Sequence, residues 1–246
     1  MGRKLSIIKI VQSALDAGSD KNLLRVYSTN NLTYSSPMHV TWHGQYTIKI
    51  QSNEVTLVID HYSTDTGLAP FRSKSDIVAL TNPTDLSMSH TDAVQGDPFL
   101  INTPGEYSIS GFNLYALGWL DENQQERSIQ LWQIESITML HVGQLNRDLS
   151  DKELQHLEKT DIDVLFLPVG GGDGLSLKQA MKLITVIEPR IVIPIHYALP
   201  GLKESLDDVT QFAKEMGISP SDQQPKIIIK AGKLPQEDVT TYILKP

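Results

Sequence analysis

Histidine, aspartate and glutamate are the side chains with which this sequence could bind a metal ion, because its 246 residues include seven histidines and no cysteine. The missing cysteines exclude thiolate ligands, disulfides and cysteine nucleophiles. Zinc needs three or four imidazole or carboxylate ligands, and the water bound to it then becomes a hydroxide near neutral pH. The chain can therefore catalyse metal-assisted hydrolysis only where several histidine, aspartate or glutamate side chains lie close together.

Other catalytic signatures are absent or weak. The sequence holds no Gly-x-Ser-x-Gly elbow, no P-loop and no dinucleotide-binding fingerprint. The glycine run Gly170–Gly174 comes directly before a predicted helix that begins near Ser176, where backbone N–H groups could cradle an anion. The run lacks the lysine of a P-loop, so we interpret it as a tight turn between a strand and a helix.

The composition narrows the class of protein. A chain of this length forms one α/β domain or at most two small ones. Its net charge of −8 and pI near 5.3 argue against nucleic-acid or membrane partners, which require a cationic patch. No stretch reaches the roughly 18–20 apolar residues of a membrane-spanning helix, and the N-terminus does not resemble a signal peptide. We expect a cytoplasmic protein.

The first half of the chain is rich in predicted strands. Helical spacing of apolar residues predicts a short amphipathic helix over 4–17, followed by a polar arm that extends to Pro37. β-Branched and aromatic residues then predict a series of strands. These predicted strands are Val40–Trp42, Tyr46–Gln51, Val55–Asp60, Ile77–Leu80, Phe99–Ile101, Glu106–Ile109, Phe112–Leu117, Ile129–Ile134 and Ile137–His141.

The second half alternates helices with apolar strands. Ser150 and Glu153 form a capping box for a helix that runs to about Lys159. Helices are also predicted for Ser176–Ile187 and Lys203–Met216, and strands for Val164–Pro168, Ile191–Ile195, Lys226–Ile229 and Thr240–Leu244. Continuous apolar strands between helices are buried on both faces. The two halves together predict an α/β fold in which two sheets lie between helices.

Seven local patterns then occur in a characteristic order: Val40–Gln45, Val58–Asp60, Ser75–Val78, Asn102–Tyr107, His141–Leu145, Asp163–Gly171 and Ile193–Tyr197. As a set they resemble the metallo-β-lactamase superfamily, in the branch of Zn-dependent hydrolases similar to the ascorbate-6-phosphate lactonases. The resemblance implies a four-layer αβ/βα sandwich with the active site on loops that follow strands. It covers about residues 38–246 and leaves residues 1–37, the helix and arm, outside.

The same resemblance implies a His-x-His-x-Asp-His motif after the strand Ile77–Leu80, where two metal ions would be bound. In this chain the four positions of the motif fall on Asn82, Thr84, Leu86 and Ser87. The aspartate that would bridge two metals is replaced by Gln144, whose neutral amide substitutes poorly for an anion. Most of the implied metal ligands are therefore missing.

Two family positions keep their residue types. His196 matches the last metal-binding histidine, and Asp60 matches an aspartate that supports the site through hydrogen bonds. His90 and His141 are candidates to replace the missing ligands. The most specific hypothesis is a rearranged metal site made of His90, His196 and Asp60. Other side chains that could take part are Asp85, Asp92 and His61. The plainer interpretation is that His196, His141 and His43 are hydrogen-bonded or packed structural histidines.

Two functions remain open at this point. We favour a catalytically degenerate member of the superfamily, a pseudoenzyme that acts as a binding, structural or assembly component, with no cofactor and with a protein partner or self-association through residues 1–37. The alternative is a metal-dependent hydrolase, with zinc as cofactor, that cleaves a small phosphorylated or lactone-type substrate at a non-standard site.

Overall fold

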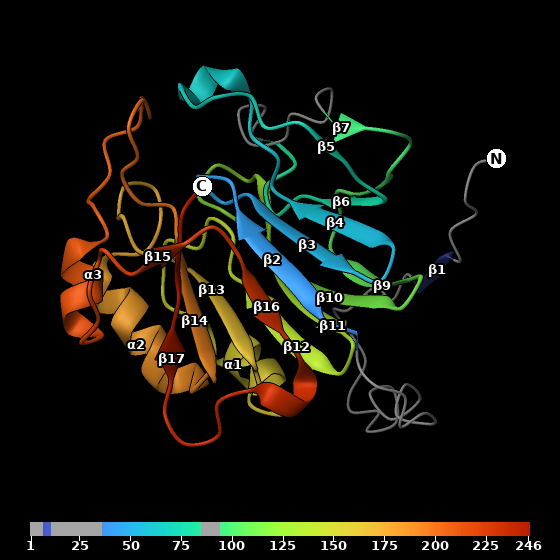
Figure 1. The fold of residues 1–246 in the computed structure, drawn as a ribbon. Helices are drawn as coiled ribbons and strands as arrows, with labels where there is room; N and C mark the ends of the chain where they lie inside the picture. The colour runs from blue at the N-terminus through green and yellow to red at the C-terminus, as the bar shows by residue number, and fades with distance from the viewer. Residues whose placement is uncertain (1–6, 11–35, 85–93) are drawn as a thin grey trace.

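Two β-sheets that face each other form the body of the protein in the computed structural model, which describes residues 7–10, 36–84 and 94–246 (Figure 1). The larger sheet has eight strands, in the spatial order β1 (Ile7–Ile10), β9 (Gly105–Ile109), β10 (Phe112–Leu120), β11 (Glu126–Ile134), β12 (Ile137–His141), β13 (Val164–Pro168), β14 (Ile191–Ile195) and β17 (Thr240–Thr241). The smaller has six, in the order β16 (Ile227–Ile229), β2 (Met38–Trp42), β3 (Ile48–Ser52), β4 (Val55–Ile59), β6 (Ile77–Ala79) and β8 (Phe99–Ile101). Two short pairs complete the strands: β5 (Ser73–Lys74) with β7 (Val94–Gln95), and β15 (Gln223–Gln224) with β18 (Ile243–Leu244).

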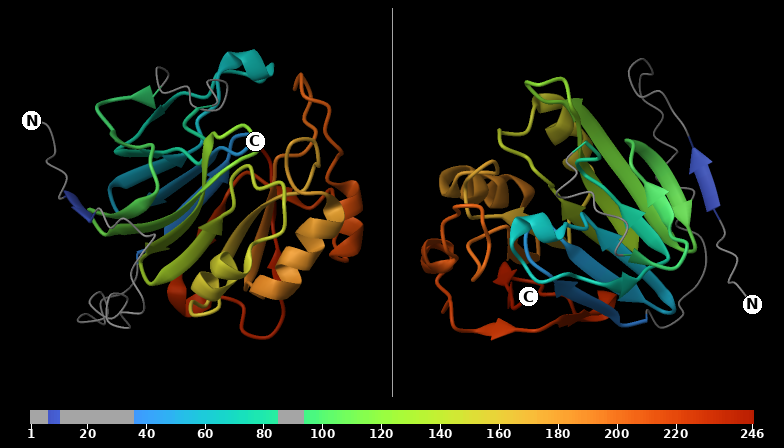
Figure 2. Two further views of the ribbon diagram at one scale, coloured as in Figure 1. Left: turned by 180° about the vertical axis from the view of Figure 1, so that it is seen from behind. Right: turned by 90° about the horizontal axis from the view of Figure 1, so that it is seen from above.

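Three α-helices are described: α1 (Asp151–Leu157), α2 (Leu177–Ile187) and α3 (Thr210–Glu215). The first two lie on the side of the larger sheet that points away from the smaller sheet (Figures 1 and 2). Both begin at a complete capping box, built by Ser150 with Glu153 and by Ser176 with Gln179. The predicted α/β class, with two sheets between helices, is confirmed. No helix in the described part of the chain combines the length and apolar character needed to cross a bilayer.

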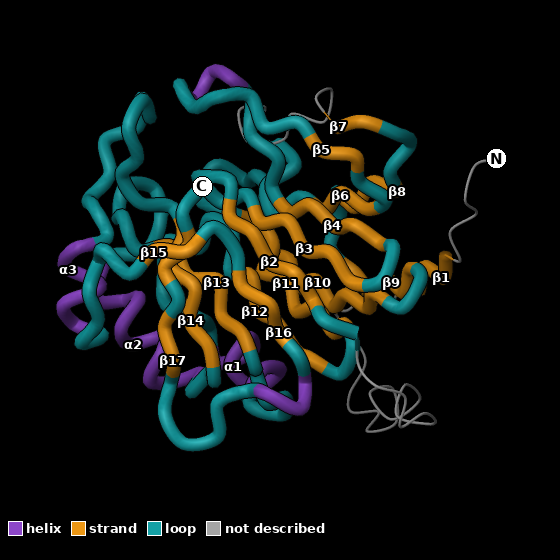
Figure 3. Tube along the Cα trace, in the orientation of Figure 1, coloured by secondary structure: helices purple, strands orange, loops and turns teal. Residues whose placement is uncertain are grey.

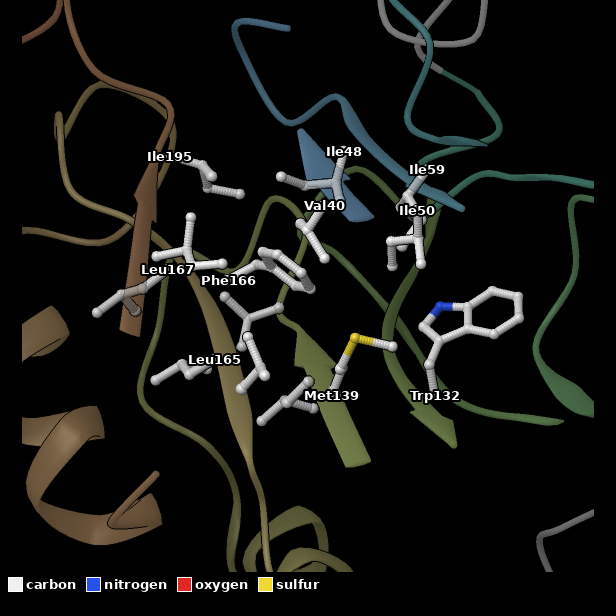
Figure 4. Close-up of a cluster of buried hydrophobic side chains, with 14 of the residues drawn as sticks. Val40, Ile48, Ile50, Ile59, Trp132, Met139, Leu165, Phe166, Leu167 and Ile195 are labelled. Carbon is white, nitrogen blue, oxygen red and sulfur yellow. The ribbon is translucent and has the colours of Figure 1, made fainter. Parts of the chain in front are cut away.

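The core lies between the two sheets. Val40, Ile48 and Ile50 of the smaller sheet face Met139 and Phe166 of the larger one (Figure 4). All five side chains are fully buried. Since burial of one such side chain contributes about 1.5–3 kcal/mol, these contacts fix how the two sheets are placed on each other.

Two predicted helices differ from the structure. Ile7–Ile10 forms strand β1, which pairs antiparallel with β9, so the helix predicted over 4–17 is wrong for these four residues. The rest of that prediction lies outside the described residues. Pairing with β9 satisfies the backbone groups of Ile-Ile-Lys-Ile that face this strand, and the β-branched residues favour a strand. The protein contact expected through residues 1–37 and the division into 1–37 and 38–246 stay predictions.

The second difference concerns the helix predicted over Lys203–Met216. Only Thr210–Glu215 is helical, and it starts at Val209, which provides no side-chain cap. The preceding residues bond instead to other loops: the N–H of Lys203 donates to the carbonyl of Thr66, and that of Asp207 to the carbonyl of Gly170. These tertiary hydrogen bonds replace those of a first helical turn, so this part of the prediction is wrong.

Candidate active site

The carboxyl ends of five strands meet at one end of the sandwich. Strands β12, β13 and β14 run parallel to one another in the larger sheet, as β4 and β6 do in the smaller one. The loops that follow them gather at the top in Figure 3. This edge is where the carboxyl ends of parallel strands usually place a ligand site.

Three buried residues at this edge have a left-handed backbone conformation: Gln45 (φ +48°), Asp60 (φ +52°) and His196 (φ +49°). Of the other six non-glycine residues with positive φ in the described part of the chain, five lie in exposed or half-exposed turns, and the exposed Glu188 ends helix α2. A left-handed conformation costs a non-glycine residue about 1–2 kcal/mol. Strain of this kind gathers at functional sites, and here it marks three positions of one edge.

One half of the edge consists of neutral groups bonded to each other. We call Asn82, Thr84 and Gln144 the amide clasp. Asn82 Nδ2 donates to Gln144 Oε1 at 2.5 Å, and Thr84 Oγ1 donates to Asn82 Oδ1 at 2.9 Å. Arg127 reaches the rim of the clasp, with Nη1 3.4 Å from Thr84 Oγ1, while it forms an ion pair with Asp121. The clasp therefore joins the loop after β6 to the loop after β12 without any charge of its own.

Asp60 supports the base of the clasp. Its Oδ1 accepts the N–H of Thr81 at 2.7 Å, and its Oδ2 accepts the hydroxyl of Thr81 at 2.5 Å. The side chain is 2% exposed. Both carboxylate oxygens thus hold the residue that precedes Asn82, which is the role of a supporting group and not of a metal ligand.

His141, three residues before Gln144 of the clasp, is fully buried. Its Nε2 is 2.9 Å from the carbonyl of Tyr46, and its Nδ1 accepts the N–H of Gly143 at 3.1 Å. The carbonyl can only accept, so Nε2 carries the proton. Burial lowers the pKa of His141 to about 4, which keeps the ring neutral at pH 7. Because both ring nitrogens are bonded to backbone, His141 does not act as a replacement metal ligand in this conformation.

The other half of the edge carries an imidazole and a carboxylate. We call His196 and Glu204 the His–Glu pair. His196 Nε2 lies 3.3 Å from Glu204 Oε2, and the same oxygen accepts a hydrogen bond from Gln45 Nε2 at 3.0 Å. The ring of Tyr46 stacks on that of His196, with centroids 4.1 Å apart. His196 is 1% exposed, and its Nδ1 has no hydrogen-bond partner among the described residues.

The glycine run packs directly against this pair. Gly171 and Gly172 have φ of +68° and +62°, and the N–H of Gly174 donates to the carbonyl of Gly171, so the run forms a tight turn. A Cβ on Gly172 would lie 3.0 Å from Glu204 Oε1, and one on Gly174 would lie 3.4 Å from His196 Nδ1. With the Glu204 carboxylate beside it, this turn is a poor place for an anion.

Glu204 and Gln45 are site residues that sequence reasoning missed. Glu204 lies in the stretch predicted as a helix, and the departure from that helix lets it reach His196. In the sequence, Gln45 stands out only as the last residue of the Val40–Gln45 pattern. Its αL backbone carries no signal in the sequence, since glutamine rarely takes this conformation.

The remaining candidates fall elsewhere. His43 stacks on Phe71 with centroids 4.0 Å apart, and His61 Nε2 bonds to the carbonyl of Phe71 at 2.8 Å. These histidines hold the loop that follows β4. Leu86, Ser87 and His90, together with Asp85 and Asp92, lie outside the described residues.

Comparisons with known proteins identify the family and the fold of this chain. A family model described as "Beta-lactamase superfamily domain" matches residues 39–196. The chain belongs to the metallo-β-lactamase superfamily. A relative named UPF0173 metal-dependent hydrolase, from a Geobacillus species, is 26% identical over 201 residues, covering 65% of this chain and 85% of its own. Another of that name, from Pyrococcus abyssi, is 27% identical over 136 residues and covers 55% and 53%.

Solved structures of the superfamily share the fold. A Thermotoga maritima protein provisionally described as a Zn-dependent hydrolase has a TM-score of 0.67 and 23% identity, covering 84% of this chain and 98% of its own. The metallo hydrolase Igni18 from Ignicoccus hospitalis has a TM-score of 0.55 and 15% identity, covering 79% and 99%. These names contradict the expectation that no cofactor takes part. They agree with the alternative expectation, which was zinc.

The two halves of the edge differ in how well they suit a metal ion. The sequence resemblance places Asn82, Thr84 and Gln144 at metal-ligand positions. These side chains are neutral and bonded to one another, so they do not fit a divalent cation. The His–Glu pair fits better: two ligand atoms of a tetrahedral zinc lie about 3.3–3.4 Å apart at bond lengths of about 2.0–2.1 Å, and the pair is separated by 3.3 Å. Within residues 7–10, 36–84 and 94–246, no three His, Asp or Glu side chains gather into a metal-binding group.

Proposed function

We propose that this protein is a metal-dependent hydrolase of a small phosphorylated or lactone-type molecule, with its reactive centre at the His–Glu pair and not at the amide clasp. The observation that carries this proposal is the 3.3 Å separation of His196 Nε2 and Glu204 Oε2 at the strand end where the superfamily has its last metal-binding histidine. The names of the relatives support the reaction class. The lactone or phosphate class follows from the resemblance in the sequence.

His196 and Glu204 would hold the ion in this proposal. A divalent metal, when bound, supplies a hydroxide near neutral pH and polarises the bond to be cleaved. The protein residues have positioning roles: Tyr46 stacks on the imidazole and limits its rotation, and the turn at Gly172 lies against Oε1 of the Glu204 carboxylate.

The test is metal analysis of protein purified without chelator, combined with turnover of p-nitrophenyl phosphate, bis(p-nitrophenyl) phosphate and a small lactone. We expect one equivalent of zinc, manganese or iron to survive dialysis and to be lost in His196→Ala together with turnover. His156→Ala is the matched control, because this histidine lies on α1, where its ring bonds to the Lys152 carbonyl of its own helix and stacks on Tyr115. Wild-type protein without metal, or turnover that survives His196→Ala, contradicts the proposal.

A second candidate is favoured by one observation. The amide clasp ties the two sheets together at superfamily ligand positions, as expected of a chain kept for its fold as a binding, structural or assembly component. The same experiment separates the two candidates, since only the hydrolase requires that metal and turnover depend on His196.

A further inference from the structure

Gln45 touches both members of the His–Glu pair. Its side chain donates from Nε2 to Glu204 Oε2 at 3.0 Å, and its carbonyl accepts the N–H of His196 at 3.0 Å. The indole N–H of Trp42 donates to the same carbonyl at 2.8 Å. Gln45 is therefore fixed by its backbone against the histidine and by its side chain against the carboxylate.

The amide oxygen of Gln45 has no hydrogen-bond partner among the described residues. The residue is 3% exposed, and Oε1 itself is buried. A buried amide oxygen without a partner costs about 1–3 kcal/mol. Turning the amide over would not help, because Oε1 would then face Glu204 Oε2, which also only accepts. A hydrogen-bond donor or a cation beside Oε1 would satisfy this oxygen.

The backbone of Gln45 adds a second cost, because its φ of +48° is unfavourable for glutamine and would suit glycine or asparagine. Two costs at one residue, next to an imidazole and a carboxylate, indicate that the missing partner is a ligand. A cation would interact with Oε1 and with the Glu204 carboxylate, while the Nε2 hydrogen bond keeps the two groups together.

We infer that Gln45 is the third protein group of a divalent-cation site, made of His196 Nε2, the Glu204 carboxylate and Gln45 Oε1. This inference rests on the proposed function. Such a site has one nitrogen and two oxygen donors, which is a harder set than the paired histidines of the superfamily motif. Oxygen donors suit manganese, and imidazole suits zinc and iron, so the site accepts Mn²⁺ as well as Zn²⁺.

The experiment uses the full chain after removal of metal with chelator. Calorimetric titration with ZnCl₂ and MnCl₂ gives affinities, and the electron paramagnetic resonance spectrum of bound Mn²⁺ reports the site without any activity assay. Gln45→Met keeps the length of the side chain and removes its oxygen, so we expect affinity for both ions to fall about 10–100-fold. Gln45→Glu adds an anionic oxygen and should raise both affinities.

The matched control is Gln130→Met. Gln130 is also fully buried, but it lies on β11 and bonds to Trp132. This variant should lose some stability in thermal unfolding and keep the wild-type affinity for both ions. If Gln45→Met binds both ions as the wild type does, while His196→Ala does not bind them, the inference about Gln45 is wrong and the proposed function stands. If the wild type binds neither ion, both are wrong.

Discussion

The amide clasp and the His–Glu pair lie at the same end of the sandwich but differ in how their polar groups are hydrogen-bonded. The clasp uses neutral side chains that satisfy one another, and Asp60 below it is bonded through both oxygens to Thr81. Beside the pair, the amide oxygen of Gln45 is buried without a hydrogen-bond partner in the described structure. A group that is already satisfied stabilises the fold, whereas one that still lacks a partner is available to a ligand. We therefore infer a structural role for the clasp, and the chemistry that we propose belongs to the pair.

We expect the largest difference between the His–Glu pair and the amide clasp in the effect of mutations on metal affinity. Glu204→Ala removes a proposed ligand and should lower zinc affinity by at least about 100-fold, since even the loss of a supporting partner costs about 10–100-fold. Asn82→Ala, in the clasp, should leave the affinity within about two-fold of wild type. Titration calorimetry on both variants checks this, and an equal loss in the two would remove the distinction between the halves.

We expect the buried His141, which is close to the clasp in the sequence, to make the stability of the protein depend on pH. The pKa of His141 is lowered to about 4 by burial, against an unfolded value near 6.5, so the unfolded chain binds more protons between these pH values. Stability therefore falls as pH decreases from about 6.5 to about 4, by about 3 kcal/mol for this group. His141→Gln keeps a donor for the Tyr46 carbonyl and should flatten the dependence in urea unfolding. A variant with the wild-type slope would show that His141 is not responsible.

A smaller loss is expected from the support beneath the clasp. Thr81→Val keeps the shape of the side chain but removes the hydroxyl that donates to Asp60 Oδ2. A hydrogen bond to a buried charged group contributes about 1.5–3 kcal/mol, so the free energy of unfolding should fall by about 2 kcal/mol. Thr185→Val, on the exposed face of α2, is the control and should change it by less than about 0.5 kcal/mol. Comparable losses in both would mean that the Asp60 contact contributes little.

The smallest effect concerns the clasp itself. Asn82→Ala and Gln144→Ala should each destabilise the protein by about 1 kcal/mol, as expected for one hydrogen bond between neutral groups. The double variant should lose less than the sum of the two, since both changes break the same bond. Chemical denaturation of the four proteins measures this coupling. A coupling near zero would show that the two amides act independently.

Much of the fold could be predicted because local signals agree with tertiary packing. The fully apolar strands Val164–Pro168 and Ile191–Ile195 and the capping boxes at Ser150 and Ser176 occur as expected. The errors arose where tertiary contacts override local preference: at Ile7–Ile10 through pairing with β9, and at Lys203–Asp207 through bonds to Thr66 and Gly170.

The candidate site was harder to predict from sequence than the fold. The resemblance pointed to His196 and Asp60, but Glu204 entered the site through the same tertiary contacts that unwound the predicted helix. Gln45 became visible only through its backbone angle and its buried oxygen. Neither property has a signature in a single sequence, since both depend on residues about 150 positions apart.

The hydrogen bond from the His196 N–H to the Gln45 carbonyl links an early part of the chain to a late one. A ribosome that adds about 5–20 residues per second needs about 8–30 s to travel from one to the other. During that interval the turn around Gln45 exists without the strand that completes it. The nascent chain therefore cannot form the His–Glu pair until β14 and the loop carrying Glu204 have left the exit tunnel, so the metal binding that we propose can only follow synthesis of this late part of the chain.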